Sequence, residues 1–132
     1  MTRIAIWGTG SIGMRHLRIF STLQGVDIFA IPTRPERVSE LRAAGFQAES
    51  QLDYLPDLDG VVVATNTRRH LSDAKAALQL GAHVLIEKPL APSKAGVRDL
   101  LDFAIAQKVG VFVGCCLRFD SSLTTFRQKL PE

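Results

Sequence analysis

A six-residue stretch near the start of the chain, Gly8–Gly13, has glycine at its first, third and sixth positions. It follows a short apolar run directly and opens a helical pattern. Gly8 permits a tight turn from strand to helix, Gly10 lets the backbone approach a phosphate with no Cβ in the way, and Gly13 allows close packing of helix on sheet. The N–H groups at the helix start would then face the phosphates. The alternative is a glycine-rich turn without a ligand, but the flanking strand and helix favour a ligand site. They predict a pyrophosphate site for a dinucleotide, formed by Gly8, Thr9, Gly10, Ser11, Ile12 and Gly13.

The residues after the second apolar run bear on which dinucleotide fits. Chains of this type usually place an acidic residue about 20 positions after the glycine loop, where it holds the ribose hydroxyls. Here Thr33 stands at that place, and Arg34 and Arg37 follow it. Without a carboxylate a 2′-phosphate is not repelled, and both arginines can pair with it. The sequence predicts a preference for NADP over NAD; the alternative is that both arginines are solvated and either cofactor is accepted.

Five short apolar runs, mostly β-branched, must position these loops. They are continuous rather than alternating, which is typical of strands buried on both faces of a parallel sheet. A further short strand is predicted at residues 46–49, at an edge of the sheet. Strands that alternate with helices predict a doubly wound α/β sheet of the Rossmann type. The five runs cover residues 4–7, 26–31, 61–64, 84–86 and 109–113.

Between the strands, apolar residues recur with the 3.6-residue period of helices. Helices are predicted over residues 11–23, 35–44, 71–78 and 97–105. Gly81 is predicted to cap the end of the third, and Ser93 to be the N-cap of the fourth. The predicted apolar side of the first helix consists of Ile12, His16, Ile19, Phe20 and Leu23.

Three further stretches carry a specific resemblance: Gly13–His16, Ala64–His70 and Glu87–Leu90. The order and spacing of these stretches match the motifs of a known family along essentially the whole chain, down to Arg118–Phe119. The chain resembles the glucose-fructose oxidoreductase, inositol dehydrogenase and rhizopine catabolism family, Gfo/Idh/MocA. It departs from the pattern at Asn66, where the family often has proline. The resemblance implies an NAD(P)-dependent oxidoreductase that acts on a sugar, cyclitol or related polyol, with a second domain that carries the rest of the substrate site.

The resemblance also implies roles for side chains, which their chemistry supports. Lys88 is the expected catalytic residue, because a desolvated lysine can hydrogen-bond the carbinol oxygen as hydride leaves and help relay charge. In family members its bond to Pro89 is typically cis. Glu87 is expected to orient the nicotinamide ribose or the loop, and His70 to support the cofactor loop. For Lys88 and Glu87 the alternatives are a surface lysine and a solvated carboxylate. Two roles stay open for Arg118, contact with the substrate and support of the interdomain loop. The other expected cofactor contacts are Ala64, Thr65, Asn66, Lys88 and Pro89.

The remaining histidines and the two cysteines are expected to be structural. None of the histidines lies at ligand spacing with a cysteine or carboxylate, so no metal site is predicted. His16 is expected to pack behind the phosphate loop, and His83 precedes a strand. The adjacent Cys115 and Cys116 cannot form a framework of loop-closing disulfides, which favours a reducing, cytoplasmic compartment. We expect both thiols to be buried; the alternative is a redox role.

Composition and charge limit the partners. The 132 residues include 16 Lys and Arg against 13 Asp and Glu, a net charge of +3. The basic residues are scattered rather than gathered in a stripe, which argues against nucleic-acid binding. The first apolar run is too short for a secretory segment or a membrane span. A small-molecule substrate, with no nucleic acid and no membrane, is therefore expected.

The length fits one domain. Residues 1–119 are predicted to form the NAD(P)-binding domain, and residues 120–132 the start of the connection to a C-terminal substrate domain that this chain lacks. Leu123, Phe126 and Leu130 form an apolar stripe at helical spacing that needs a partner. The resemblance implies a homo-oligomer at full length. Two hypotheses remain open: the nucleotide-binding part of an oxidoreductase, catalytically incomplete alone, or a self-standing nucleotide-binding or regulatory module.

Overall fold

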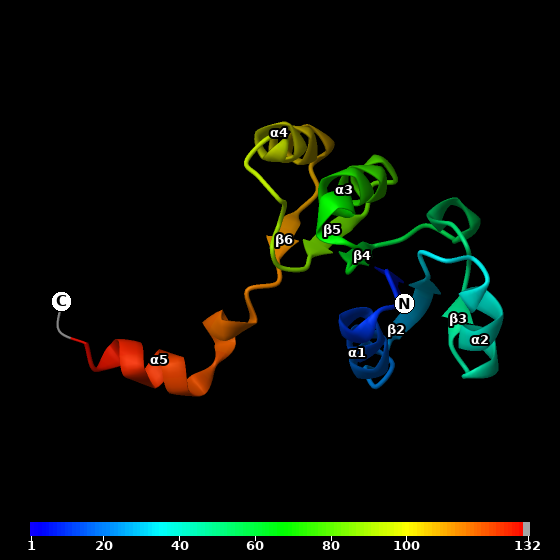
Figure 1. Ribbon diagram of the computed structural model, residues 1–132, viewed down its shortest axis with the longest axis horizontal. Helices are drawn as coiled ribbons and strands as arrows, with labels where there is room; N and C mark the ends of the chain where they lie inside the picture. The colour runs from blue at the N-terminus through cyan, green and yellow to red at the C-terminus, as the bar shows by residue number, and fades with distance from the viewer. Residues whose placement is uncertain (131–132) are drawn as a thin grey trace.

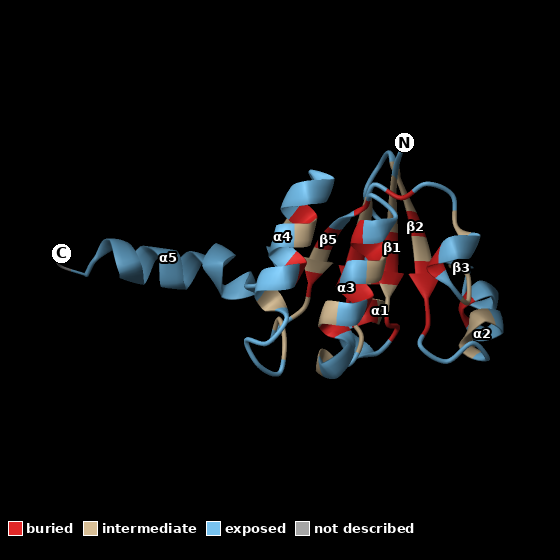
Figure 2. Cartoon of the chain, turned by 90° about the horizontal axis from the view of Figure 1, so that it is seen from above, coloured by how far each residue is buried: buried red, intermediate tan, exposed pale blue. Residues whose placement is uncertain are grey.

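The computed structural model describes residues 1–130, in which six parallel strands form one sheet with helices on both faces (Figure 1, Figure 2). The strand order β3-β2-β1-β4-β5-β6 confirms the predicted Rossmann-type fold. The strands are β1 (Thr2–Trp7), β2 (Val26–Ile31), β3 (Gln47–Ala48), β4 (Gly60–Val63), β5 (His83–Ile86) and β6 (Val111–Val113). The helices are α1 (Ser11–Phe20), α2 (Arg37–Ala43), α3 (His70–Gln79), α4 (Val97–Gln107) and α5 (Ser121–Gln128). Three short 3-10 turns are η1 (Leu52–Tyr54), η2 (Thr67–Arg69) and η3 (Cys116–Phe119).

The strands are apolar on both faces because each face is covered by helices. Ala5 of β1 lies in a core with α3 and α4, whereas its neighbour Ile6 lies in a second core with α1 and α2. The same alternation holds in β4, where Val61 and Val63 face the first core and Val62 the second. Figure 2 shows the strands largely buried between helices whose outer sides are exposed. The continuous apolar runs are therefore explained by burial on two sides.

The register of the sheet brings the ends of five strands into one row. Trp7 is aligned with Ile31 on one side and Val63 on the other, Val63 with Ile86, and Ile86 with Val113. The loops that leave β1, β2, β4, β5 and β6 therefore begin side by side at the carboxyl edge. This is the edge at which open α/β sheets bind ligands.

The rotation of α1 about its axis differs from the prediction. Its buried residues are Gly13 and Leu17, which lie outside the predicted apolar side. Gly13 sets this rotation, because a Cβ at that position would lie 1.8 Å from the carbonyl oxygen of Gly8. The members of the predicted apolar side that remain exposed are Ile12, Ile19 and Leu23. These three residues of the predicted apolar side therefore face away from the core, and α1 ends at Phe20 instead of residue 23.

The start of α4 also differs from the prediction. Its first residue is Val97 and its N-cap is Gly96, in the left-handed conformation with φ +76°. Ser93 is not the N-cap, because its hydroxyl oxygen accepts a hydrogen bond from the Ala95 N–H in a local turn. Gly81, in contrast, follows the end of α3 with φ +79°, as predicted.

The segment after β6 leaves the sheet and ends in α5, which extends away from the rest of the chain (Figure 1). The predicted apolar stripe is exposed: Leu123 and Phe126 lie on α5, and Leu130 follows the end of the helix at Gln128. Cys115 and Cys116 are exposed as well, so the expectation of buried thiols was wrong. No element among residues 1–130 covers the chain after Gly114, and burial of the thiols needs such a cover.

Candidate nucleotide-binding site

The glycine loop joins β1 to α1 at the carboxyl edge, and its glycines serve different purposes. Gly8 has φ +97°, and a Cβ there would lie 2.5 Å from the carbonyl oxygen of Ala64. Only glycine therefore allows the loops after β1 and β4 to touch. A Cβ at Gly10 would meet nothing within 4 Å. Packing within the chain does not require glycine at position 10, whereas the close approach of a ligand would.

The N-terminus of α1 is chemically suited to an anion. Its N-cap residue Gly10 makes no side-chain cap, and the first turn carries no acidic side chain. In α5, by contrast, the N-cap residue is Asp120, and its carboxylate accepts a hydrogen bond from the Leu123 N–H at 2.9 Å. Ser11 and Ile12, in the first turn of α1, are exposed. The backbone donors and the positive end of the helix dipole fit the phosphates of a nucleotide.

Thr9 and Arg37 connect the glycine loop to α2. Thr9 is only 3% exposed. Nη1 of Arg37 donates to the Thr9 carbonyl oxygen at 2.7 Å and to its hydroxyl oxygen at 3.1 Å. Nε of the same arginine lies 3.4 Å from the Glu40 carboxylate. Arg37 therefore braces the loop, whereas Thr33 and Arg34 stay exposed between β2 and α2.

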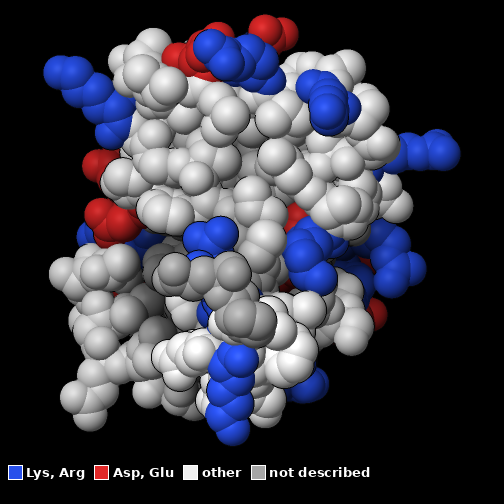
Figure 3. Space-filling model, turned by 90° about the vertical axis from the view of Figure 1, so that its left-hand side faces the viewer, with Lys and Arg blue, Asp and Glu red and all other residues white. Residues whose placement is uncertain are grey.

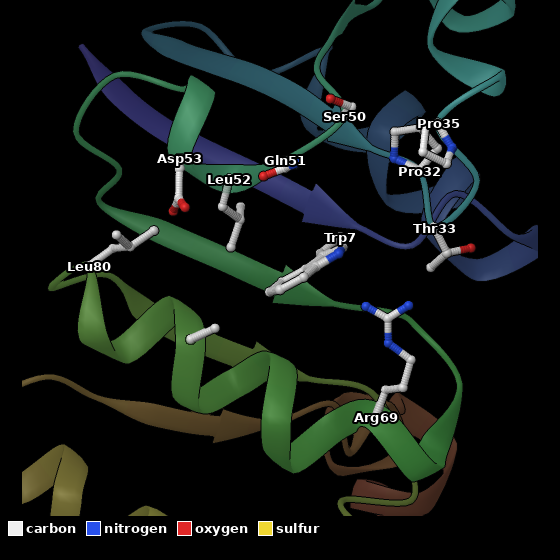
Figure 4. Close-up of a pocket in the computed structure, with 11 residues that line it drawn as sticks. Trp7, Pro32, Thr33, Pro35, Ser50, Gln51, Leu52, Asp53, Arg69 and Leu80 are labelled. Atoms are coloured by element: carbon white, nitrogen blue, oxygen red, sulfur yellow. The ribbon is translucent and has the colours of Figure 1, made fainter.

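A half-open hollow of about 320 Å³ lies beside Thr33 (Figure 4). It is lined by Pro32 and Pro35 from the loop after β2, by residues 50–53 around η1, and by the side of α3 that faces η1. Trp7 and Arg69 also line it, with the guanidinium carbon 5.8 Å from the centre of the indole ring. Sequence analysis missed these two residues. The signals available for them were the end of the first strand and the position directly before His70.

The segment from β4 to α3 is held by its own side chains. The Asn66 side chain accepts a hydrogen bond from the Arg68 N–H at 3.0 Å and so caps η2. The Thr65 hydroxyl donates to the Asp73 carboxylate at 2.7 Å. Ala64 is buried against the glycine loop. The Thr65 hydroxyl proton and the Asn66 side-chain oxygen are engaged within the chain, so Asn66 keeps its side-chain NH2 donors, besides its backbone groups, for a nucleotide.

His70 connects this segment to the loop that carries Lys88. The ring is 2% exposed, with Nδ1 2.8 Å from the Pro89 carbonyl oxygen and Nε2 3.1 Å from the Thr65 carbonyl oxygen. A buried ring that reaches both loops fixes their spacing. These contacts fit the supporting role expected for His70.

We expect His70→Ala to lower the free energy of unfolding by about 2–4 kcal/mol, since it removes a fully buried side chain and its hydrogen bonds. Urea unfolding followed by circular dichroism measures this. His83→Ala is the control: His83 is exposed, accepts one hydrogen bond from the Gly110 N–H, and should cost less than about 1 kcal/mol. Equal losses in the two variants would contradict the bridging role of His70.

Glu87, Lys88 and Pro89 follow β5, and the Lys88–Pro89 bond is cis, as the resemblance implies. The Lys88 side chain is exposed at the carboxyl edge. Oε1 of Glu87 lies 2.6 Å from Nε2 of His16 on α1, and its Oε2 accepts from the Lys88 N–H at 3.3 Å. Of the two expected roles of Glu87, orientation of the loop is the one these contacts support. His16, which was expected to pack behind the phosphate loop, contacts Glu87 and so anchors the lysine loop to α1.

The other features considered in the sequence analysis lie outside the loops after β1, β4 and β5. Arg118 is exposed in η3, beyond the end of β6. Within residues 1–130, no group of three His, Cys, Asp or Glu side chains is placed to hold a metal ion. None of the helices in this part of the chain has the length and apolar character to cross a membrane. On the face seen in Figure 3, the Lys and Arg side chains are separated rather than gathered in a stripe.

Comparison with known proteins agrees with this arrangement. The family model described as "Oxidoreductase family, NAD-binding Rossmann fold" matches residues 2–115. The chain is 31% identical over 134 residues to 4-carboxy-2-hydroxymuconate-6-semialdehyde dehydrogenase of Sphingobium sp. strain SYK-6, a match that covers 97% of this chain and 42% of that protein. It is 30% identical over 139 residues to inositol 2-dehydrogenase/D-chiro-inositol 3-dehydrogenase of Shouchella clausii, with 98% and 40% covered.

A solved structure extends the likeness to the fold. Biliverdin reductase from Synechocystis sp. PCC 6803, in complex with biliverdin and NADP+, matches with a TM-score of 0.83 and 25% identity over 97% of this chain and 42% of that one. The chain thus spans about two fifths of the length of these relatives. The match to the family model, together with the glycine loop and the Glu87–Pro89 loop at one sheet edge, shows that the chain belongs to the Gfo/Idh/MocA oxidoreductase family.

Proposed function

We propose that this chain binds NADP(H) and forms the cofactor-binding part of an oxidoreductase that acts on a sugar, cyclitol or related polyol. The observation that carries the proposal is the sheet register. It places the loop after Trp7 and the loop after Ile86 at the same edge, with β4 between them. A nucleotide with its pyrophosphate on the glycine loop would extend its nicotinamide toward Lys88. The inositol dehydrogenase among the relatives supports the substrate class.

Different groups of the chain along this edge would have different roles. The α1 N-terminus and Gly10 would hold the pyrophosphate, and His70 and the His16–Glu87 pair would fix the lysine loop. When bound, the nicotinamide accepts or supplies the hydride. Lys88 would hydrogen-bond the substrate oxygen and help move its proton as the carbinol is oxidised. Arg118, in η3, is a candidate substrate contact.

The test of the activity uses the full-length enzyme that contains this chain. Its reduction of NADP+ with cyclitols and sugars, myo-inositol first, would be followed by the absorbance of the reduced nicotinamide. Turnover that is saturable in the substrate supports the proposal. Tight NADPH binding without turnover on any polyol would favour a nucleotide-binding or regulatory module instead.

The preference for NADP rests on the loop after β2. Thr33 supplies no carboxylate to repel a 2′-phosphate, and Arg34 is exposed beside it. Since Nη1 of Arg37 is engaged by Thr9, Arg34 is the cation most available to the phosphate, and Arg37 would contribute through its remaining donors.

Arg34→Ala should weaken NADPH binding by about tenfold and change NADH binding by less than about twofold, because one charge-assisted contact to the 2′-phosphate is lost. Isothermal titration of the chain with each cofactor measures both values. Arg98→Ala on the exposed side of α4 is the charge-matched control. An equal loss for NADH and NADPH would show that Arg34 does not read the 2′-phosphate.

We also propose a cellular compartment and a domain arrangement for the protein. The two exposed cysteines would stay reduced in the cytoplasm. Residues 1–119 would be the nucleotide-binding domain, and residues 120–132 would lead into a substrate domain, with subunit contacts in a homo-oligomer. The exposed stripe formed by Leu123 and Phe126 of α5 and by Leu130 just after it supports this, because these side chains make a face suited to packing.

A further inference from the structure

One end of the sheet is uncovered on one face. Leu85 of β5 packs partly against the core that α1 and α2 form with the sheet, and it is aligned with Phe112 of β6. Aligned residues of neighbouring parallel strands point to the same side, so Phe112 lies on this face too. Phe112 is 60% exposed and belongs to neither core. Figure 1 shows α3 and α4 on one side of the sheet and α1 and α2 on the other, with no helix of residues 1–130 opposite α4.

The apolar side of α1 borders this uncovered face. His16 contacts the Glu87 carboxylate, which follows β5, so the side of α1 that carries His16 is turned toward β5. Residues three and four positions away lie on the same side of a helix, and here they include Ile12 and Ile19, which are 40% and 51% exposed. The apolar period of α1 is therefore directed at the uncovered strands and not at the core. We call the surface formed by these two isoleucines with Leu85 and Phe112 the open face.

Glycines beside β6 keep the open face low. Gly110 and Gly114 lie two positions on either side of Phe112, so they point to the same face of the sheet. A Cβ at Gly110 would lie 2.8 Å from the Phe112 ring, and a Cβ at Gly114 would lie 3.4 Å from the Glu87 carboxylate. On the opposite face of β6, Val111 packs against the core with α3 and α4. Since glycine in a strand often marks the close approach of another backbone, the open face is suited to a closely packed helix.

The open face has the dimensions that one helix covers. α1, which borders it, has 10 residues and is about 15 Å long. Two neighbouring strands, here β5 and β6, are about 10 Å wide, close to the diameter of a helix with its side chains. One helix of about three turns, lying alongside α1, would therefore cover Leu85, Phe112 and Ile19 together.

The charges beside the open face select the kind of helix. Ile12 and Ile19 share a surface hollow with Arg15 and Arg18 of α1. A helix with an apolar side, and with Asp or Glu where it meets α1, fits this surface. α5 does not fit, because it carries Arg127 and no acidic side chain. The chain spans about two fifths of the length of its relatives, so about three fifths of such a protein lies outside it and is available to supply the helix.

We propose that an amphipathic helix from the part of the full-length protein that follows residue 132 packs on the open face and completes this side of the sheet. Its apolar residues would contact Phe112 and Ile19, and its acidic residues would lie near Arg15. This inference rests on the proposed function, which places a substrate domain after this chain. Because Glu87 lies beside one end of the open face, the helix would hold the substrate domain next to the loop that carries Lys88.

Thiol labelling measures whether position 112 is covered. Phe112→Cys is combined with Cys115→Ser and Cys116→Ser, and maleimide labelling of its peptide is followed by mass spectrometry in the 132-residue chain and in the full-length protein. Labelling should be at least about tenfold slower in the full-length protein, because the side chain reacts only when the helix is displaced. Ile105→Cys is the control: Ile105 is 74% exposed on α4, outside the open face, and should react at similar rates in both. Equal rates for position 112 in the two proteins would overturn the proposal.

Photo-cross-linking identifies the segment that covers this position. Benzoylphenylalanine at position 112 keeps an aromatic side chain there and is activated by light in the full-length protein. The expected product has the mass of one chain and joins position 112 to a peptide beyond residue 132. A product with the mass of two chains would assign the open face to a second copy, and a cross-link to residues 121–128 would assign it to α5. Either result would refute the proposed occupant.

Phe112→Asp gives a readout that does not depend on labelling. It should lower the Tm of the full-length protein by about 5 °C or more, because it places a carboxylate in an apolar contact. The Tm of the 132-residue chain should change by less than about 2 °C, since Phe112 is exposed in it. Ile105→Asp is the matched control and should have a small effect on both proteins. Equal shifts of the two proteins by Phe112→Asp would contradict the proposal.

Titration of the full-length protein with NADPH separates this inference from the proposed function. If NADPH does not bind, the proposed function fails, whatever the labelling of position 112 shows. If NADPH binds and position 112 is labelled as fast as in the 132-residue chain, only the docking of the helix fails.

Discussion

Replacement of Lys88 by alanine in the proposed polyol oxidoreductase is expected to lower kcat by about a hundredfold or more, the usual effect of losing a positioned proton-transfer group. Lys88 is exposed, and its side chain makes no part of the two cores. Its removal leaves the hydrogen bonds of Glu87 to His16 and of His70 to the Pro89 carbonyl in place. NADPH affinity should therefore change by less than about twofold, because the pyrophosphate and adenosine contacts lie elsewhere.

Steady-state kinetics with the preferred polyol, together with calorimetric titration of NADPH, separates turnover from cofactor binding. Lys94→Ala is the matched control, since Lys94 is an exposed lysine further along the same connection between β5 and α4. It should keep wild-type turnover. Unchanged turnover in Lys88→Ala would refute a catalytic role for this lysine.

Two glycine-to-alanine changes in the same loop should have opposite effects. Gly13→Ala places a Cβ 1.8 Å from the carbonyl oxygen of Gly8, a clash between backbone segments that no side-chain movement relieves. We expect it to lower the free energy of unfolding by about 3 kcal/mol or more. Gly10→Ala meets nothing within 4 Å, and φ −72° at Gly10 suits alanine, so the unfolding free energy should change by less than about 1 kcal/mol.

For NADPH binding by the folded variants, in contrast to stability, the larger loss is expected in Gly10→Ala. A Cβ at position 10 would occupy the space through which the pyrophosphate approaches α1. NADPH affinity of Gly10→Ala should fall by about tenfold or more, as when hydrogen bonds to a charged group are lost. Urea unfolding and NADPH titration of both variants provide the two measurements. Gly10→Ala with wild-type NADPH affinity would show that the phosphates do not bind on this loop, and a fully stable Gly13→Ala would contradict the packing of α1.

Local sequence predicted the fold because the strands are apolar on both faces and the glycine spacing is tied to a strand and a helix. The order of the strands, and with it the order of the loops along the sheet edge, was not part of the prediction and is known from the structure. The rotation of α1 could not be predicted, because it depends on the close packing of Gly13 against the Gly8 carbonyl, where a Cβ would clash, and not on the apolar period of Ile12 and Ile19. The start of α4 was misplaced because Ser93 makes a local turn instead of a cap.

Contacts between residues that are far apart in the sequence could not be predicted from the sequence pattern. His16 and Glu87 are 71 residues apart, and nothing in either motif indicates their hydrogen bond. The brace between Arg37 and Thr9 spans 28 residues, and it gives Arg37 a role in the loop that the sequence did not predict. Trp7 and Arg69 meet only because the register aligns the ends of β1 and β4.

Calorimetric titration of the wild-type chain with NADPH and with NADH tests the central claim most directly. The account predicts that one molecule of NADPH binds per chain, about tenfold or more tightly than NADH, because Thr33 stands where a ribose-binding carboxylate is usual and Arg34 is exposed beside it. Tighter binding of NADH would contradict the predicted preference. Absence of binding for both nucleotides would contradict the assignment of the carboxyl edge as a nucleotide site.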